Sequence, residues 1–116
     1  MNVAFYMDVH VPRAVTHGLR LRGIDVVTAQ EDGSATFDDA QLVSRVTVLE
    51  RVRVLQDTDM LREGAMLLRA GRQFSGIIYA SQLRVTLGEM IGDLELLAKA
   101  TTPAEWVGQI EHLPLR

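Results

Sequence analysis

Two aspartates, Asp8 and Asp57, each follow a short apolar run of the kind that forms a buried strand. Strand propensity gives no reason for an acidic side chain at the end of such a run. Carboxylates held close together repel one another unless a cation neutralises them, and hard oxygen ligands favour Mg²⁺ or Mn²⁺. Such a cation can lower the pKa of a bound water and hold a phosphate for in-line attack. The chemistry that fits is therefore metal-dependent hydrolysis of a phosphodiester.

Asp38, Asp39 and Asp59 are further candidates for the same metal and catalytic site. Each stands at the start of a predicted helix, where an acid also stabilises the first turn by capping and by the helix dipole. A structural role is therefore the competing interpretation for all three. His10, close after Asp8, is a candidate for orienting substrate or a water, although a loop histidine is more often simply solvated.

The composition limits the chemistry that the chain can perform. The 116 residues carry a net charge of −3 and contain no cysteine, which excludes disulfides, thiolate metal sites and cysteine nucleophiles. Almost all the basic residues are arginine, a side chain suited to phosphate, and Arg13 and Arg84 are candidates for substrate contacts. His17 lies within a predicted helix and has no evident partner. Without an apolar stretch of about 18 residues or a signal-like N-terminus, we expect a soluble, cytoplasmic protein with no membrane partner.

Apolar runs alternate with segments of helical period, which predicts an α/β fold in one domain over residues 1–116. The predicted strands are residues 3–7, 25–28, 52–56 and 76–80, with a last edge strand within 110–115. The predicted helices are residues 12–22, 38–50, 59–70, 86–100 and one that starts at 102, and residues 30–37 are expected to form a loop.

Local signals predict where these helices begin and end. Gly23 suits the left-handed position that ends a helix, and Thr86 with Glu89 forms a capping box. The helix near residue 38 is capped either by Thr36, through a box with Asp39, or by Asp38 itself. Trp106 is expected to pack in the interior of the protein.

Strand–helix–strand repeats require right-handed crossovers and therefore a parallel sheet. Such a sheet binds ligands beyond the carboxyl ends of its strands, where the winding reverses. If the strand order is 2-1-3-4, strands one and three are neighbours. Asp8 and Asp57 would then face each other across the switch point.

The chain resembles a family of small PIN-like proteins of uncharacterised function, relatives of the toxin-type PIN ribonucleases. The matching stretches are residues 7–12, 22–30, 38–42, 56–61, 76–80, the Gly88-Glu89 helix and the tail 111–114. The resemblance implies a PIN-like three-layer sandwich with a central, mainly parallel sheet of four to five strands. It also implies a Mg²⁺ or Mn²⁺ cofactor and ribonuclease chemistry on an RNA substrate.

The resemblance assigns Asp8 as the first metal-binding aspartate and places Asp57 and Asp59 in an Asp-x-Asp motif. It assigns Asp38, with Asp39 beside it, as the acid that opens the middle helix. Two departures stand out: Val9 and His10 replace a Glu and an Asn common in the family, and Leu55 replaces a Thr.

The resemblance also suggests partners. A small helix-turn-helix protein would complete a toxin–antitoxin-like pair. A homodimer is expected from the wide apolar stripe on the helix over residues 86–100; the alternative interpretation is that the whole stripe covers the sheet.

Two other functions compete with the nuclease. The first is a catalytically weak or inactive PIN-like module that acts by binding a protein partner. The second is a phosphoacceptor receiver domain, in which Asp57 would accept the phosphoryl group. Receivers also need a lysine at the end of a fifth strand, whereas Lys99, the only lysine, lies in a predicted helix.

Overall fold

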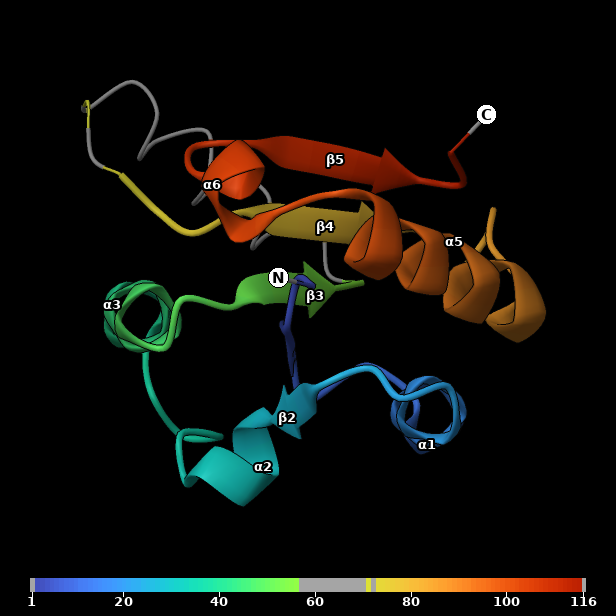
Figure 1. The fold of residues 1–116 in the computed structure, drawn as a ribbon. Coiled ribbons are helices and arrows are strands. Elements are labelled where there is room, and N and C mark those ends of the chain that lie inside the picture. The colour runs from blue at the N-terminus through green and yellow to red at the C-terminus, as the bar shows by residue number, and fades with distance from the viewer. Residues whose placement is uncertain (1, 57–70, 72, 116) are drawn as a thin grey trace.

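The computed structural model describes residues 2–56, 71 and 73–115. Within these residues, a five-stranded sheet has the order β2-β1-β3-β4-β5, and every neighbouring pair is parallel (Figure 1). The strands are β1 (Phe5–Met7), β2 (Val26–Thr28), β3 (Val52–Leu55), β4 (Ile77–Ala80) and β5 (Ile110–Leu113). The predicted order of the first four strands is confirmed, and so is a last strand at the edge.

Helices cover both faces of this sheet. They are α1 (Arg13–Leu21), α2 (Ala29–Asp32), α3 (Asp39–Val48), α5 (Leu87–Ala100) and α6 (Pro103–Trp106). Buried side chains of α1, α5 and α6 pack in one core with strand residues, whereas α2 and α3 pack against the opposite face. The expected α/β class, with helices on both sides of a central parallel sheet, is confirmed.

The two cores follow from the alternation of side chains along the strands. In β1, Phe5 and Met7 belong to the core beneath α1 and α5, while Tyr6 between them belongs to the core beneath α2 and α3. All three residues are buried, as expected for a strand covered on both faces. β1 is therefore covered by helices on both faces of the sheet.

The predicted helix ends are largely confirmed. Gly23 has φ of 77° and its N–H donates to Arg20 O, while the N–H of Ile24 donates to Leu19 O at 3.1 Å. Thr86 and Glu89 form the predicted capping box at the start of α5. Of the two caps proposed for α3, Asp38 is the one used, because its side chain accepts a hydrogen bond from the N–H of Gln41.

The loop predicted over residues 30–37 is partly wrong, since α2 occupies Ala29–Asp32. One turn is too short to show helical periodicity, which is why the apolar pattern misses it. Its signal is the capping box of Thr28 and Glu31, which is complete in the structure. The helix predicted over residues 59–70 lies outside the described residues.

The apolar stripe of α5 serves mainly to cover the sheet. Met90, Leu94 and Ala98 are buried, and Ile91 and Leu97 pack against the same core. Trp106 is also buried there, which confirms its predicted packing role. In the part of the chain that the structure describes, no helix is both long and apolar enough to cross a membrane.

Candidate functional site at the carboxyl edge of the sheet

Asp8 follows β1 directly and is 4% exposed. Its N–H donates to Val54 O of β3 at 3.0 Å, so the hydrogen bonds between the two strands continue to this residue. From β1 the chain enters α1 on one face of the sheet, and from β2 it enters α2 and α3 on the other. Asp8 therefore lies at the switch point, where open parallel sheets bind ligands.

Within the described part of the chain, the carboxylate of Asp8 has two contacts of different kinds. Oδ2 accepts a hydrogen bond from the backbone N–H of His10 at 3.3 Å. Oδ1 lies 3.9 Å from Nη2 of Arg53, a residue of β3 that is only 2% exposed. A buried guanidinium at this distance offsets the negative charge of Asp8 without a hydrogen bond between the two side chains.

Of the remaining acids of the predicted site, Asp38 is the one whose side chain the structure describes. Asp38 is exposed and caps α3, which is the structural role weighed for it above. Asp39 is the first residue of α3, and Asp57 and Asp59 lie outside the described residues. Among the residues that are described, no three acidic or histidine side chains are grouped so that they could hold one metal ion.

The candidate substrate residues do not all lie at one place in the structure. Arg13 lines a pocket beside Asp8, and His10 touches Asp8 through its backbone N–H while its side chain is exposed. Arg84 is exposed in the turn after β4, where its N–H donates to Ser81 O. Since β3 lies between β1 and β4, Arg84 does not belong to the pocket beside Asp8.

The pocket beside Asp8, here called the α1–α2 pocket, has a volume of about 360 Å³. It opens between α1 and α2, beyond the carboxyl ends of β1 and β2. Its lining residues are Asp8, Val11, Arg13, Thr16, His17, Arg20, Thr28, Gln30 and Glu31.

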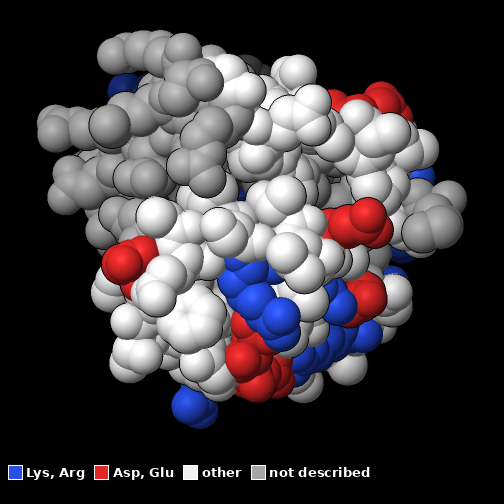
Figure 2. All heavy atoms as spheres, turned by 90° about the vertical axis from the view of Figure 1, so that its left-hand side faces the viewer, with Lys and Arg blue, Asp and Glu red and all other residues white. Residues whose placement is uncertain are grey.

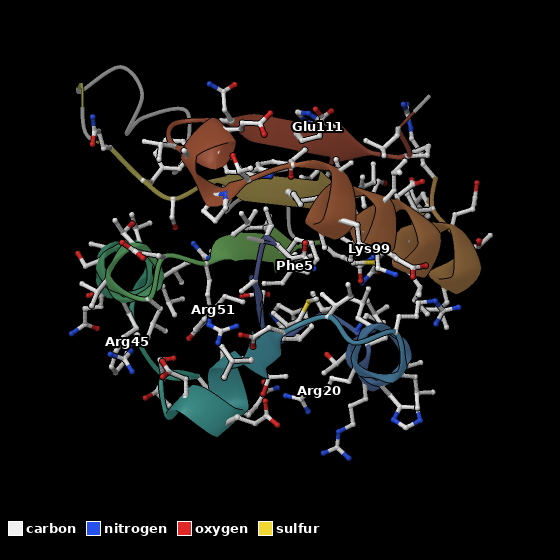
Figure 3. All side chains as sticks on the ribbon, viewed as in Figure 1. Phe5, Arg20, Arg45, Arg51, Lys99 and Glu111 are labelled. Atoms are coloured by element: carbon white, nitrogen blue, oxygen red, sulfur yellow. The ribbon has the colours of Figure 1, made fainter. Side chains whose placement is uncertain are left out.

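An ion pair between Arg20 and Glu31 joins the two helices that form this pocket. Nη2 of Arg20 lies 2.6 Å from Oε1 of Glu31 and also donates to Val26 O at 2.8 Å. Figure 3 shows the Arg20 side chain between α1 and α2. The Arg20 guanidinium, with help from the N–H of Thr28, lowers the pKa of Glu31 to about 2. Glu31 is therefore ionised at neutral pH and fixes α2 against α1.

A second polar cluster lies on the face of the sheet that α2 and α3 cover. The buried Tyr6 hydroxyl is hydrogen-bonded to Ser34, whose Oγ donates to Oδ2 of Asp32 at 2.8 Å. Arg45 of α3 donates to both carboxylate oxygens of Asp32, at 3.0 and 2.7 Å. These bonds, those from Arg45 first, lower the pKa of Asp32 to about 2, whereas burial raises the pKa of Tyr6. Since Tyr6 pairs with Arg53 across β1 and β3, this cluster borders the charge pair of Asp8.

Sequence reasoning missed most of the α1–α2 pocket. Arg13, His17 and Arg20 recur at intervals of four and three, a spacing that places them on one side of a helix. That spacing was the available signal, together with the capping box of Thr28 and Glu31. Arg53 was visible only as a charged residue within an apolar run, and its partner could not be read from the sequence.

On the face that Figure 2 presents, basic and acidic side chains lie next to each other and form no large patch of one sign. This agrees with the small net charge of −3. Comparisons of this chain with protein-family models, with curated proteins and with solved structures found no match.

Proposed function

We propose that this protein is a PIN-like ribonuclease that hydrolyses RNA phosphodiesters with the help of Mg²⁺ or Mn²⁺. The observation that carries the proposal is the position of Asp8. It is buried at the switch point of a parallel sheet, and its strand is hydrogen-bonded to β3, the strand that leads into Asp57. Open parallel sheets bind ligands at this point, so an acid here is well placed to meet one.

Oxygen donors at the carboxyl ends of β1 and β3 are of the type that a hard divalent cation binds. Gln56 follows β3, and its Oε1 is buried without a hydrogen-bond partner among the described residues. A carboxylate and an amide oxygen are both ligands that Mg²⁺ and Mn²⁺ accept. The described donors are too few for a closed site, so Asp57 and Asp59 would have to supply the remaining ligands.

When bound, the cation would supply a water of lowered pKa and an electrostatic clamp on the phosphate. The protein's own residues have simpler tasks. Asp8 provides a fixed negative charge, held in place by the N–H of His10. Arg13 stands beside it in the α1–α2 pocket and can contact a phosphate oxygen through its guanidinium.

The test is cleavage of a fluorescent single-stranded RNA with Mn²⁺ or Mg²⁺, compared with EDTA. Asp8→Asn and Asp57→Asn should each lower the rate at least 100-fold, an order of magnitude typical of lost transition-state electrostatics. Asp25→Asn is the matched control, because Asp25 precedes β2 at the opposite end of the strands and pairs with Arg51. Equal rates for all three variants and the wild type would rule out this site, provided that circular dichroism shows each variant folded.

One observation favours a second function, a PIN-like module that binds a partner without catalysis. Arg53 lies 3.9 Å from Asp8 and already offsets the charge that a metal would neutralise. A protein of this kind could act within a toxin–antitoxin-like pair, bound to a small helix-turn-helix protein. It would show no metal-dependent cleavage, and Mn²⁺ would leave its melting temperature unchanged. Cleavage that is lost in Asp57→Asn would exclude this alternative.

A further inference from the structure

The charges that line the α1–α2 pocket are not all balanced. The carboxylate of Glu31 is paired with Arg20, and that of Asp8 is close to Arg53 behind it. Arg13 lines the same pocket, and it makes no ion pair or side-chain hydrogen bond with another described residue. Of the two arginines and two carboxylates that line the pocket, Arg13 is therefore the one whose charge has no partner among the described residues.

Neutral polar groups in the pocket add to this arrangement. His17 lines it one helical turn after Arg13 and likewise has no polar side-chain contact within the described chain. Thr16 is only 7% exposed, lines the pocket, and makes no side-chain hydrogen bond to another described residue. A hydroxyl in this position can donate a hydrogen bond to a ligand oxygen.

The two carboxylates do not turn the pocket into a cation site. Glu31 is held by Arg20 at 2.6 Å and by the N–H of Thr28 at 2.9 Å, so the bonds it can accept are largely used on the protein itself. With Asp8 offset by Arg53, the charge that is left for a ligand is that of Arg13. An arginine beside hydroxyl and imidazole groups is the combination that recognises phosphate oxygens.

We propose that the α1–α2 pocket binds a phosphate group, with Arg13, His17 and Thr16 as its ligands. The volume of about 360 Å³ is ample for one phosphate group with part of the nucleoside attached to it. That this phosphate belongs to the RNA substrate rests on the proposed function. The pocket then holds a phosphate of the RNA strand next to the one at Asp8 and sets the direction in which the strand crosses the sheet edge.

The test measures binding without turnover. A labelled single-stranded RNA of ten uridines is titrated in EDTA, with fluorescence anisotropy recorded at several salt concentrations. Arg13→Gln should weaken binding severalfold and make the salt slope shallower by about 0.7, the value for one phosphate contact on a single strand. Arg22→Gln is the matched control, since Arg22 lies at the end of the same helix and contacts Gly18 O and Glu95 instead.

Inorganic phosphate distinguishes a free anion from a phosphodiester within a strand. Shifts of the amide signals of Thr16 and His17 on adding phosphate, absent in Arg13→Gln, would show that the phosphate group alone is recognised. RNA binding that depends on Arg13 without a response to phosphate would show that the strand is required, and it also supports the pocket. Equal affinities and salt slopes for Arg13→Gln and Arg22→Gln would overturn the proposal. RNA bound through Arg13 but not cleaved with Mn²⁺ would instead remove the proposed nuclease and leave the pocket standing.

Discussion

At the scale of single residues, buried charges in this protein are held by specific partners. Asp32 shows this most fully, because it accepts bonds from Arg45, Ser34 and the Tyr6 hydroxyl while its side chain is only 9% exposed. The pKa of its carboxyl is therefore lowered to about 2, mainly by Arg45. A carboxyl whose pKa is lower in the folded than in the unfolded chain stabilises the fold above its unfolded pKa.

Arg45→Gln should remove most of this pH-dependent stabilisation. In the wild type, the contribution of Asp32 is fully present above about pH 4 and is lost as the pH falls from 4 toward 2. Arg45→Gln should therefore be less stable than the wild type at pH 7, and the difference should shrink at pH 2. Urea unfolding at both pH values measures this. Arg84→Gln is the control and should be neutral at both, because Arg84 is exposed and makes no ion pair with another described residue.

At the scale of elements, close packing fixes where a side chain can be tolerated. α6 approaches the start of β4 so closely that a Cβ on Gly76 would lie 2.9 Å from Trp106 O, and Gly76 has φ of 114°. Gly92 in α5 has a helical backbone and nothing within 4 Å of the place where its Cβ would stand.

Alanine at these two glycines should have opposite effects. Gly76→Ala should destabilise the protein by about 1–3 kcal/mol, because the strained backbone and the contact with Trp106 cannot both be relieved. Gly92→Ala should stabilise it by about 0.5–1 kcal/mol, because alanine loses less conformational entropy in a helix. Thermal unfolding of both variants provides the comparison. A stabilised Gly76→Ala would contradict the packing of α6 described above.

At the scale of the whole molecule, the topology decides which distant residues meet. The order β2-β1-β3-β4-β5 brings the end of β1 beside the end of β3, although 46 positions separate Asp8 from Val54 (54 − 8). The proposed metal site follows from this arrangement, and its effect on global stability can be measured.

Saturating Mn²⁺ should stabilise the folded protein, because the proposed site requires Asp8 and Asp57 to be held at the ends of neighbouring strands. At 100 times the dissociation constant the gain is about 2.7 kcal/mol. Asp57→Asn should lose most of this gain, while Asp25→Asn should keep it. Differential scanning calorimetry with and without Mn²⁺ provides the measurement, and an unchanged wild-type melting temperature would argue against the metal.

A homodimer stays a prediction from the resemblance. Most of the apolar stripe of α5 is used within the core, which leaves Leu83 and Leu87 as exposed apolar side chains near its start. Light scattering at micromolar concentration should give about twice 12.9 kDa if this end of α5 joins two copies. A mass of 12.9 kDa would remove the dimer.

The sequence by itself determined the features that depend on neighbours along the chain. Apolar periodicity predicted the alternating strands and helices, and right-handed crossovers then required the parallel sheet that is observed. The end of α1 at Gly23 and the start of α5 at Thr86 were also predictable, because the groups that cap a helix lie within a few residues of its end. Asp8 at the end of β1 could also be singled out, because it directly follows an apolar run that forms a buried strand.

Only the tertiary structure decided what each polar side chain meets. The pairing of Asp8 with Arg53 joins two strands, and the pocket between Arg13 and Glu31 joins two helices. No periodicity or capping motif in the sequence predicts either contact, because packing of the sheet and helices brings the two partners together. Asp38 differs from these residues, because its capping role depends only on neighbours along the chain. The sequence predicted both this role and the alternative of a metal ligand, and the structure shows the cap. Residues close in the sequence determine where a helix ends, whereas the charge balance of a site depends on residues far apart in the chain.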